Sequence, residues 1–320
     1  MSNKLNVCVQ TSCWYSVMNN DRNYVDQCVK FIKECGFDGV DFNIDHALPG
    51  SKIKSGELTD FFDKSTEEIL EFFTPFKEAC EKHGISVEQM HAPFPAYVED
   101  NDEVNDYLIT AMEKSFAVAH FLNCKAVVVH PASLDDKEKE KQVNLERYRR
   151  LIPAAKKYGV IICLENMFRT LRGQKVEGAC STAEETVWYV DKLNEEAGEK
   201  VFGYCFDIGH ATLLKRDIYQ FIKALDDRLT ILHIHDNNGD GDFHLAPFTQ
   251  RTFKENYTST DWDAFIKGLK EIGYTGPLSF ETFNALVLSP KPLHEPMLRF
   301  IAETGKYFKE QIENQRGKNE

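Results

Sequence analysis

The stretch LTILHIHDNNGDGDFHL, residues 229–245, places a short apolar run directly before a group of histidines and aspartates. Ile231, Leu232 and Ile234 predict a buried strand, and polar side chains become frequent only where this strand ends. Imidazole and carboxylate groups at a strand end can bind a divalent cation without opening the core. The stretch therefore predicts a strand that carries metal-binding residues at its carboxyl end.

Four further apolar runs end in the same way. AVVVHPA ends in His130, VIICLENM in Glu165, YCFDIGH in Asp207 and His210, and LSFETF in Glu281. A buried charge without a partner costs several kcal/mol, so five such runs in one chain are hard to explain by chance. The pattern indicates a metalloenzyme.

Short β-rich runs alternate with longer amphipathic stretches along the whole chain, which is typical of parallel βα units. We expect eight strands, over residues 7–12, 39–44, 86–92, 126–130, 160–166, 202–208, 230–236 and 277–282. Eight such units predict an α/β fold, a (β/α)8 TIM barrel, as a single domain over residues 1–320 with a frayed tail at 313–320. The strand ends of this fold meet at one face, where every candidate ligand is expected to lie.

Composition narrows the class of function. A chain of 320 residues with 42% hydrophobic residues can bury a full core. Its net charge of -13 disfavours nucleic acid as a partner and favours a small-molecule substrate. Nine cysteines without a C-x-x-C pair indicate a reducing, cytoplasmic location, and no apolar run is long enough for a signal peptide or a membrane span.

The motifs HAPF at 91, VHPA around 130, LENM around 165, FDIGHA around 207, HIHDNNGDGDFHL at 233 and SFETF around 281 carry a family resemblance. Together they resemble the xylose isomerase-like superfamily of TIM barrels, which includes sugar phosphate isomerases and epimerases, inosose dehydratases and endonuclease IV of the AP endonuclease family 2. The resemblance implies one divalent metal held by Glu165, Asp207, His233 and Glu281. His233 is preferred to His235 because the family frame is His, any residue, a polar residue and then an acid.

A divalent ion such as Mn²⁺, the preferred cofactor, or Mg²⁺, Co²⁺ or Zn²⁺ suits these ligands. We expect an isomerase or epimerase that acts on a sugar, keto-sugar or related polyol by proton abstraction next to a carbonyl, through a metal-stabilised enediolate. Glu165 and Glu281 come from different sides of the barrel, so one can remove the proton and the other return it on the opposite face. His210 is expected to hydrogen-bond the oxygen that becomes negative.

Further residues are candidates for contact with the carbohydrate substrate. They are His91, His130 and His46 at strand ends, His235 either behind the ligands or facing the substrate, and Trp14 as an apolar wall or a packing residue. The loop from Ala246 to Ser259, with Phe248, Arg251, Phe253, Lys254 and Tyr257, is long enough to set substrate choice. The resemblance also implies a homo-oligomer, and a subunit of a mixed complex remains open.

Three alternatives stay open at the level of sequence. The same site could act as a lyase, by inosose-type dehydration or 3-keto-glycoside cleavage. His91, His130, His210, Asp242 and His244 match the additional ligands of endonuclease IV, which suggests a trinuclear-zinc phosphodiester hydrolase, although the acidic composition argues against it. Gly239 stands at the position where ketose 3-epimerases carry an arginine. The third alternative is a catalytically inactive barrel.

Overall fold

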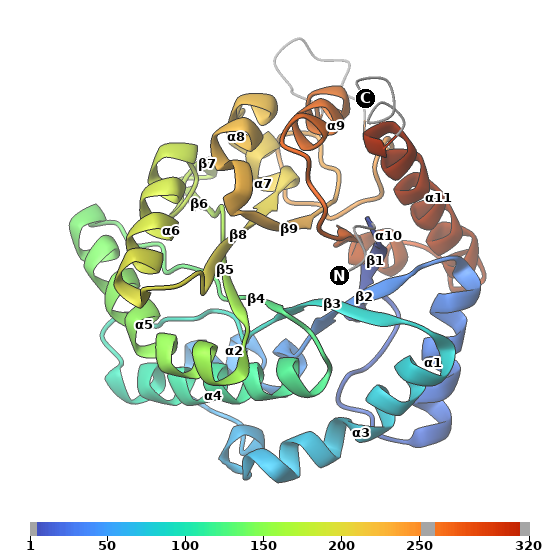
Figure 1. The fold of residues 1–320 in the computed structure, drawn as a ribbon, viewed down its shortest axis with the longest axis horizontal. Helices are drawn as coiled ribbons and strands as arrows, with labels where there is room; N and C mark the ends of the chain where they lie inside the picture. The colour runs from blue at the N-terminus through green and yellow to red at the C-terminus, as the bar shows by residue number, and fades with distance from the viewer. Residues whose placement is uncertain (1–4, 251–259, 314–320) are drawn as a thin grey trace.

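A ring of parallel strands surrounded by helices makes up the fold (Figure 1), in a computed structural model that describes residues 5–250 and 260–313. The strands of the ring are β1 (Val7–Gln10), β2 (Gly39–Asn43), β3 (Ser86–His91), β4 (Ala126–Val128), β5 (Ile161–Glu165), β8 (Phe202–Asp207), β9 (Leu229–His233) and β10 (Leu278–Phe280). Their order in the sheet is β10-β1-β2-β3-β4-β5-β8-β9, and every pair is parallel. The expected (β/α)8 TIM barrel is confirmed.

The barrel closes between β9 and β10 through a single bridge, Ile234 to Phe280. The Ile234 amide donates to the Ser279 carbonyl at 2.8 Å, and the Glu281 amide donates to the Ile234 carbonyl at 3.1 Å. All eight expected strands are present, but several stop short of their expected ends. Strand β9, for example, ends at His233, and only two isolated bridges follow in this stretch, Ile234 to Phe280 and Asp236 to Leu245.

The helices cover the outside of the barrel. They are α1 (Arg22–Cys35), α2 (Gly50–Ser55), α3 (Thr66–His83), α4 (Asp102–Phe121), α5 (Lys137–Tyr158), α6 (Ala183–Ala197), α7 (Ile208–Leu213), α8 (Ile218–Leu225), α9 (Trp262–Glu271), α10 (Phe283–Val287) and α11 (His294–Glu313). Side-chain caps begin most of the long ones, as in α3, where Ser65 and Glu68 form a capping box. Within the described ranges, no helix combines the length and apolar character that a membrane crossing needs.

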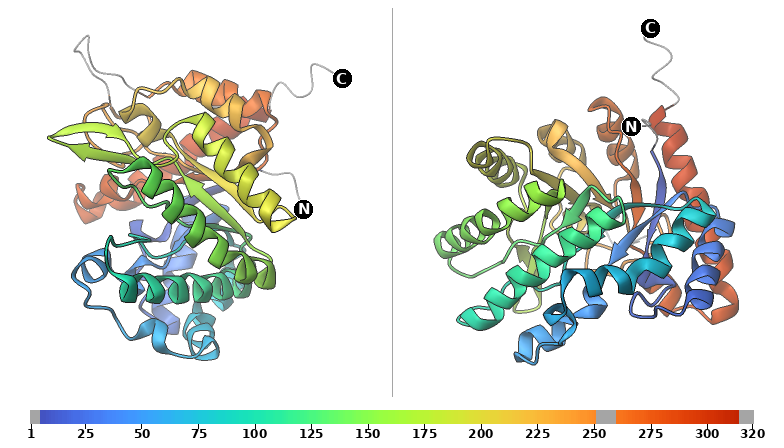
Figure 2. Two further views of the ribbon diagram at one scale, coloured as in Figure 1. Left: turned by 90° about the vertical axis from the view of Figure 1, so that its left-hand side faces the viewer. Right: turned by 60° about the horizontal axis from the view of Figure 1, so that its bottom comes forward.

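One element of the described chain lies outside the barrel pattern and was not expected. Strands β6 (Phe168–Leu171) and β7 (Gln174–Glu177) form an antiparallel hairpin that projects from the barrel after β5 (Figure 2). Its turn uses Arg172 and Gly173, both with positive φ, which is the geometry of a tight hairpin turn.

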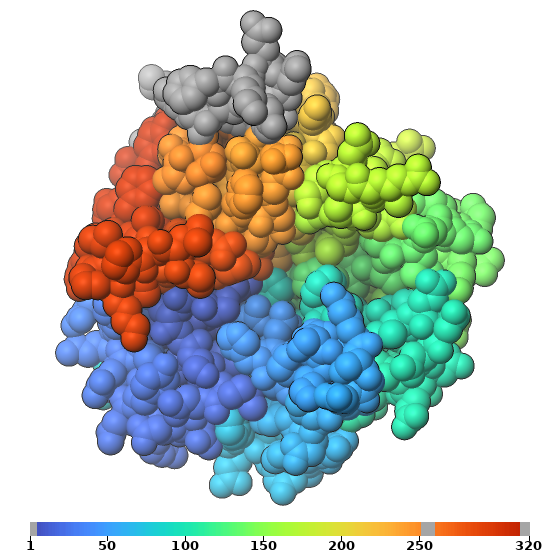
Figure 3. Space-filling model, turned by 180° about the vertical axis from the view of Figure 1, so that it is seen from behind, coloured from blue at the N-terminus to red at the C-terminus, as the bar shows by residue number. Residues whose placement is uncertain are grey.

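The loops that follow the strands gather on one face of the barrel. Figure 3 views this face, where the segment around α10, the region of α2 and the β6–β7 hairpin surround the centre. The expected tail at 313–320 lies outside the described residues except for Glu313, as do residues 251–259 of the proposed substrate-choice loop. All nine cysteines are described and free.

Candidate metal centre

One nitrogen of His233 faces three carboxylates. His233 Nδ1 lies 3.1 Å from Glu165 Oε1, 3.4 Å from Glu281 Oε2 and 3.8 Å from Asp207 Oδ2. Three of the four side chains are almost fully buried, and that of Glu281 is 13% exposed. The structure thus brings together the four residues that the sequence predicts as metal ligands.

The strands place these groups by ending on them. Glu165, Asp207 and His233 are the last residues of β5, β8 and β9, and Glu281 follows β10 directly. The next residue after Glu165 aligns two of these ends, since Asn166 Nδ2 donates to the Asp207 carbonyl at 2.7 Å and the Asp207 amide donates to Asn166 Oδ1 at 2.8 Å. The convergence therefore follows from barrel geometry and from one reciprocal amide contact.

Asp41, on β2, lies behind this centre and was not expected from the sequence. Its Oδ1 accepts a hydrogen bond from His91 Nδ1 at 3.0 Å, and its Oδ2 lies 3.8 Å from His233 Nε2. Gln89 Nε2 also donates to Asp41 Oδ2 at 3.1 Å. A carboxylate on the far side of a ligating histidine orients the ring and raises its basicity. Asp41 therefore faces the nitrogen of His233 that is turned away from the three other carboxylates.

The predicted substrate-facing histidines contact two of the carboxylates. His130 Nε2 lies 2.9 Å from Glu165 Oε2, and His91 Nε2 lies 3.9 Å from Glu281 Oε1. Gln10, another residue that the sequence reading missed, donates from Nε2 to Glu281 Oε1 at 2.7 Å. Each glutamate is thus contacted from two directions, which fixes its carboxylate relative to the centre.

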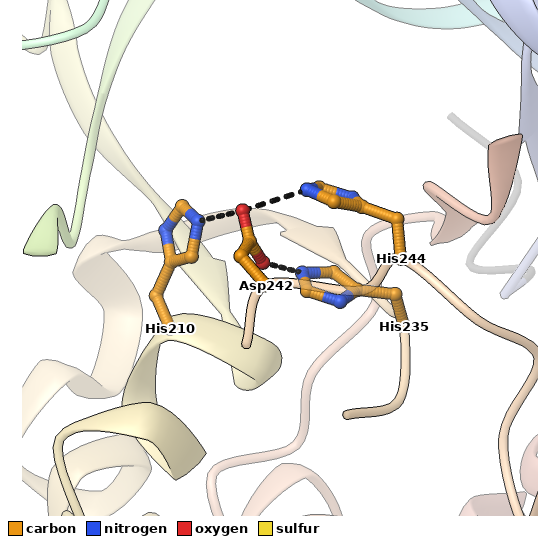
Figure 4. Close-up of side chains that lie close together, drawn as sticks. All are labelled: His210, His235, Asp242 and His244. Carbon is orange, nitrogen blue, oxygen red and sulfur yellow. Dashed lines mark hydrogen bonds and ion pairs between the residues drawn. The ribbon is translucent and has the colours of Figure 1, made fainter. Parts of the chain in front are cut away.

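A second group of possible ligands, which we call the Asp242 cluster, lies beside the first (Figure 4). It consists of His210, His235, Asp242 and His244. Asp242 Oδ2 lies 2.9 Å from His244 Nε2 and 3.5 Å from His210 Nε2, and Asp242 Oδ1 lies 3.8 Å from His235 Nε2. His210 Nδ1 lies 2.8 Å from the Asn166 carbonyl, to which a ring N–H there would donate. His235 Nε2 is also 3.0 Å from Asp207 Oδ2, so the two groups are contiguous.

Gly209 makes room for this arrangement. A Cβ atom built at Gly209 would overlap the ring of His235, so any other residue there forces the imidazole or the start of α7 to move. His235 itself is fully buried and does not line the cavity. Its position corresponds to the expectation that places it behind the predicted ligands.

The carboxylates of the site raise the pKa of neighbouring imidazoles. Burial alone lowers the pKa of His91, but Asp41 and Glu281 outweigh it and raise the pKa to about 10. The pKa of His244 is likewise raised, to about 9, by Glu281 and Asp242 against the effect of burial. For Glu165, burial raises the pKa, but His233 and His130 hold it well below its usual range.

A cavity of about 660 Å³ opens above the centre. Its walls include His46, His91, His130, His210, Asp242, His244, Glu165 and Glu281, but no lysine or arginine among the described residues. Three phenylalanines among its lining residues each contact a histidine, namely Phe94 with His130, Phe168 with His210 and Phe283 with His244. Trp14 is not among the cavity-lining residues, and its ring packs against the core beside Tyr15, as the packing alternative expects.

The donor set fits a divalent metal. Carboxylate oxygens and imidazole nitrogens of Glu165, Asp207 and His233 lie within 4.8 Å of one another, and Glu281 completes the set around His233 Nδ1. Buried Asp242 Oδ1 and His235 Nδ1 lack a hydrogen-bond partner among the described residues, which is unusual unless something else binds there. The nine positions that match a trinuclear site also converge at this face: His91, His130, Glu165, Asp207, His210, His233, Asp242, His244 and Glu281.

Fold and site together define a (β/α)8 barrel whose strand ends present carboxylates and imidazoles to one cavity. The chain belongs to the xylose isomerase-like TIM barrel family, whose model matches residues 29–304.

Individual proteins resemble the chain over only part of its length or at low sequence identity. An uncharacterised protein of Methanocaldococcus jannaschii is 30% identical over 209 residues, which cover 61% of this chain and 64% of that protein. The ketose 3-epimerase of Arthrobacter globiformis is 26% identical over 143 residues, 44% of this chain and 41% of that enzyme. The chain spans less than two thirds of the length of the curated relatives that it matches. A solved structure of the IolI protein with a bound zinc atom has the same fold, with a TM-score of 0.62 and 19% identity, covering 96% of this chain and 97% of that one.

Proposed function

We propose that the protein is a divalent-metal-dependent isomerase or epimerase of a sugar, keto-sugar or related polyol. The observation that carries the proposal is the approach of Glu165, Asp207 and Glu281 to one nitrogen of His233, at the floor of a cavity. The similarity to a ketose 3-epimerase and to a zinc-containing barrel supports it.

Glu165, Asp207, His233 and Glu281 would hold the metal. When bound, it supplies Lewis acidity that makes the hydrogen on a carbon next to a carbonyl easier to remove. Mn²⁺ is the ion we expect, since carboxylate-rich sites with one imidazole suit hard divalent cations.

Glu165 and Glu281 are positioned to move the proton. They extend from β5 and from the end of β10, with β8 and β9 between them in the sheet, so they reach a substrate carbon from different directions. One glutamate removes the proton, and the other returns it to the opposite face, which inverts the carbon. Contacts with His130 and Gln10 keep the two carboxylates oriented during the transfer.

His210 is placed to stabilise the developing negative charge. Its ring lies at the cavity wall, oriented by the contact of Nδ1 with the Asn166 carbonyl, and Nε2, 3.5 Å from Asp242 Oδ2, is the nitrogen that would turn its N–H to the substrate oxygen. A hydrogen bond from a ring that is already oriented is worth more than one that must first be organised.

The test is solvent deuterium uptake into a panel of ketoses and keto-glycosides, after elemental analysis of the purified protein. We expect deuterium at one carbon adjacent to the carbonyl and a rate at least about 100-fold lower in Glu165→Gln. Glu177→Gln, on the exposed hairpin, is the matched control and is expected to keep the full rate. Full turnover by Glu165→Gln would contradict the proposal, and metal content measured in both variants separates lost binding from lost proton transfer.

The Asp242 cluster favours a second candidate, a phosphodiester hydrolase with several metals. This candidate predicts about three tightly held ions per chain and cleavage of DNA at abasic sites. A stoichiometry near one metal per chain would remove it, and the net charge of -13 already disfavours a nucleic acid substrate. A lyase using the same residues would be recognised in the sugar panel by release of the substituent on the next carbon.

A further inference from the structure

Asp45, in the loop after β2, carries a carboxylate that the proposed reaction does not use. It lines the cavity above the candidate metal centre, and its Oδ1 atom is buried without a hydrogen-bond partner among the described residues. Burial raises the pKa of this carboxyl, and His91, His130 and Asn43 offset that effect only in part. A buried acceptor without a donor costs free energy, so a native protein rarely keeps one unless another molecule supplies the donor.

Asp45 follows a strand that lies across the barrel from the candidate metal centre. In the ring of strands, three strands separate β2 from β8 in either direction, and β8 carries Asp207. The other three ligands come from β5, β9 and the end of β10. Residues of both sides line the same cavity of about 660 Å³. A sugar with its carbonyl at the metal therefore extends its remaining carbons toward the wall that contains Asp45.

This wall is the polar side of the cavity outside the metal ligands and their histidines. Ser12, Asn43 and His46 lie on it with Asp45, at the ends of β1 and β2. The apolar lining residues come from other segments, and they are Phe94, Met167, Phe168, Phe283 and Val287. The cavity thus offers hydrogen-bonding groups at the side where the far end of a sugar would lie.

Asp45 and Asn43 form a pair that suits a hydroxyl group. Asn43 Oδ1 accepts a hydrogen bond from the Asp45 amide at 2.8 Å, and the Asn43 side chain is also one of the groups that lower the pKa of Asp45. The two side chains are therefore neighbours. A hydroxyl group both donates and accepts, and a carboxylate beside an amide provides an acceptor and a donor for it.

The charge of Asp45 disfavours an anionic group at the same place. No lysine or arginine of the described residues lines the cavity, so a phosphate beside Asp45 would meet a like charge without a cation to bind it. A neutral hydroxyl group meets no such repulsion, and its hydrogen bond to a carboxylate is stronger than one to a neutral acceptor.

We propose that Asp45 is a specificity-determining residue, which accepts a hydrogen bond from a hydroxyl group at the end of the sugar remote from the metal. The inference rests on the proposed function, since that function places the carbonyl end of the substrate at the metal centre. It adds the residue that recognises the far end, and it assigns to that end a free hydroxyl group instead of a phosphate.

The test measures binding of ketoses that differ by one hydroxyl group. Fructose, psicose, tagatose and sorbose are titrated calorimetrically into the protein saturated with Mn²⁺, followed by the 1-deoxy and 6-deoxy forms of the sugar that binds most tightly. We expect one deoxy form to bind about 10- to 100-fold more weakly than its parent, the range of a hydrogen bond to a charged group. Equal binding of the parent and both deoxy forms would overturn the proposal.

Variants assign this difference to Asp45. Asp45→Ala is expected to bind the parent and that deoxy form almost equally, and Asp45→Asn to keep part of the difference because a neutral acceptor remains. The Mn²⁺ content of both variants should be unchanged, since Asp45 belongs to none of the possible ligand groups in the described ranges. Asp63→Ala, which removes an exposed aspartate outside the cavity, is the matched control. A difference that survives Asp45→Ala would also overturn the proposal.

A phosphorylated ketose tests the charge of Asp45. The parent sugar phosphorylated at the sensitive position is expected to bind at least about tenfold more weakly than the free sugar, and Asp45→Asn should recover part of this loss because the repulsion is removed. Tighter binding of the phosphorylated sugar to the unaltered protein would show that the far end binds an anion, and would overturn the proposal.

Deuterium uptake separates this inference from the proposed function. If the contribution of the hydroxyl group depends on Asp45 but no sugar takes up deuterium, the recognition stands and the reaction is wrong. If a ketose takes up deuterium and Asp45→Ala leaves its binding and its KM unchanged, the reaction stands and the role of Asp45 is wrong.

Discussion

At the scale of single residues, the candidate metal centre depends on side chains that do not themselves face the cavity. Asp41 hydrogen-bonds His91 and lies 3.8 Å from His233 Nε2, and Gly209 leaves the space that the His235 ring fills. Neither position could be selected from the sequence. Asp41 lies within an apolar strand rather than at its end, and the role of Gly209 depends on a ring 26 positions further along the chain.

Replacing Asp41 tests whether it acts by positioning His233. Asp41→Asn keeps the volume of the side chain but removes the negative charge that orients the two rings. We expect the affinity for Mn²⁺ to fall about 10- to 100-fold, with a smaller fall in kcat once the variant is saturated with metal. Asp60→Asn, before the short helix at Phe61–Asp63, is the control. Unchanged metal affinity in Asp41→Asn, measured by competition with a chelator, would contradict this role.

At the scale of elements, the strands were predictable and the hairpin was missed. Apolar runs that end in His130, Glu165, Asp207 and Glu281 identify strands of a barrel because buried parallel strands need both faces apolar. The hairpin has no such run: its residues FRTL and QKVE are half-exposed, and only the Arg172–Gly173 pair marks the turn. That signal was present in the sequence. The sequence carried no signal for the contact of Phe168 with His210, because this contact depends on how the hairpin leaves β5.

The packing of α11 against β1 depends on a helical glycine. Alanine normally stabilises a helix relative to glycine by about 1 kcal/mol. At Gly305, however, a Cβ atom would overlap Val7 on β1, so we expect Gly305→Ala to lower the free energy of unfolding by about 1–3 kcal/mol. Thermal unfolding measures the change, with Glu310→Ala on the exposed face of the same helix as the control. A melting temperature equal to or above that of the unaltered protein would show that the overlap is relieved without cost.

At the scale of the whole molecule, the fold concentrates negative charge at one end of the barrel. Five buried or nearly buried carboxylates, Asp41, Glu165, Asp207, Asp242 and Glu281, lie among histidines, and no lysine or arginine lines the cavity in the described part of the chain. Either protons or a cation must balance them. Fold class and the convergence of the four predicted ligands could be anticipated from the sequence, but this balance required distances between residues far apart in the chain.

The same balance predicts how stability depends on pH. The folded-state pKa values of His91 and His244 are raised to about 10 and about 9 from an ordinary value of 6.5. Their contribution to the free energy of unfolding is therefore fully present below pH 6.5 and is lost as the pH rises through 9 to 10. We expect the free energy of unfolding of the metal-free protein, measured with urea in the presence of a chelator, to fall over that range. The Mn²⁺-saturated protein should change less, and equal slopes for both forms would contradict the prediction.

A cation bound at the candidate metal centre would also affect the single bridge between Ile234 and Phe280. This seam has His233 immediately before it and Glu281 immediately after it, so one ion bound by both would fasten the two edges where the ladder is shortest. Metal loading should therefore slow hydrogen–deuterium exchange of the Ile234 and Glu281 amides far more than exchange along β2 and β3, which pair over five positions. A metal ion bound for catalysis would then also stabilise the closure of the barrel between β9 and β10, and its removal would destabilise this part of the barrel.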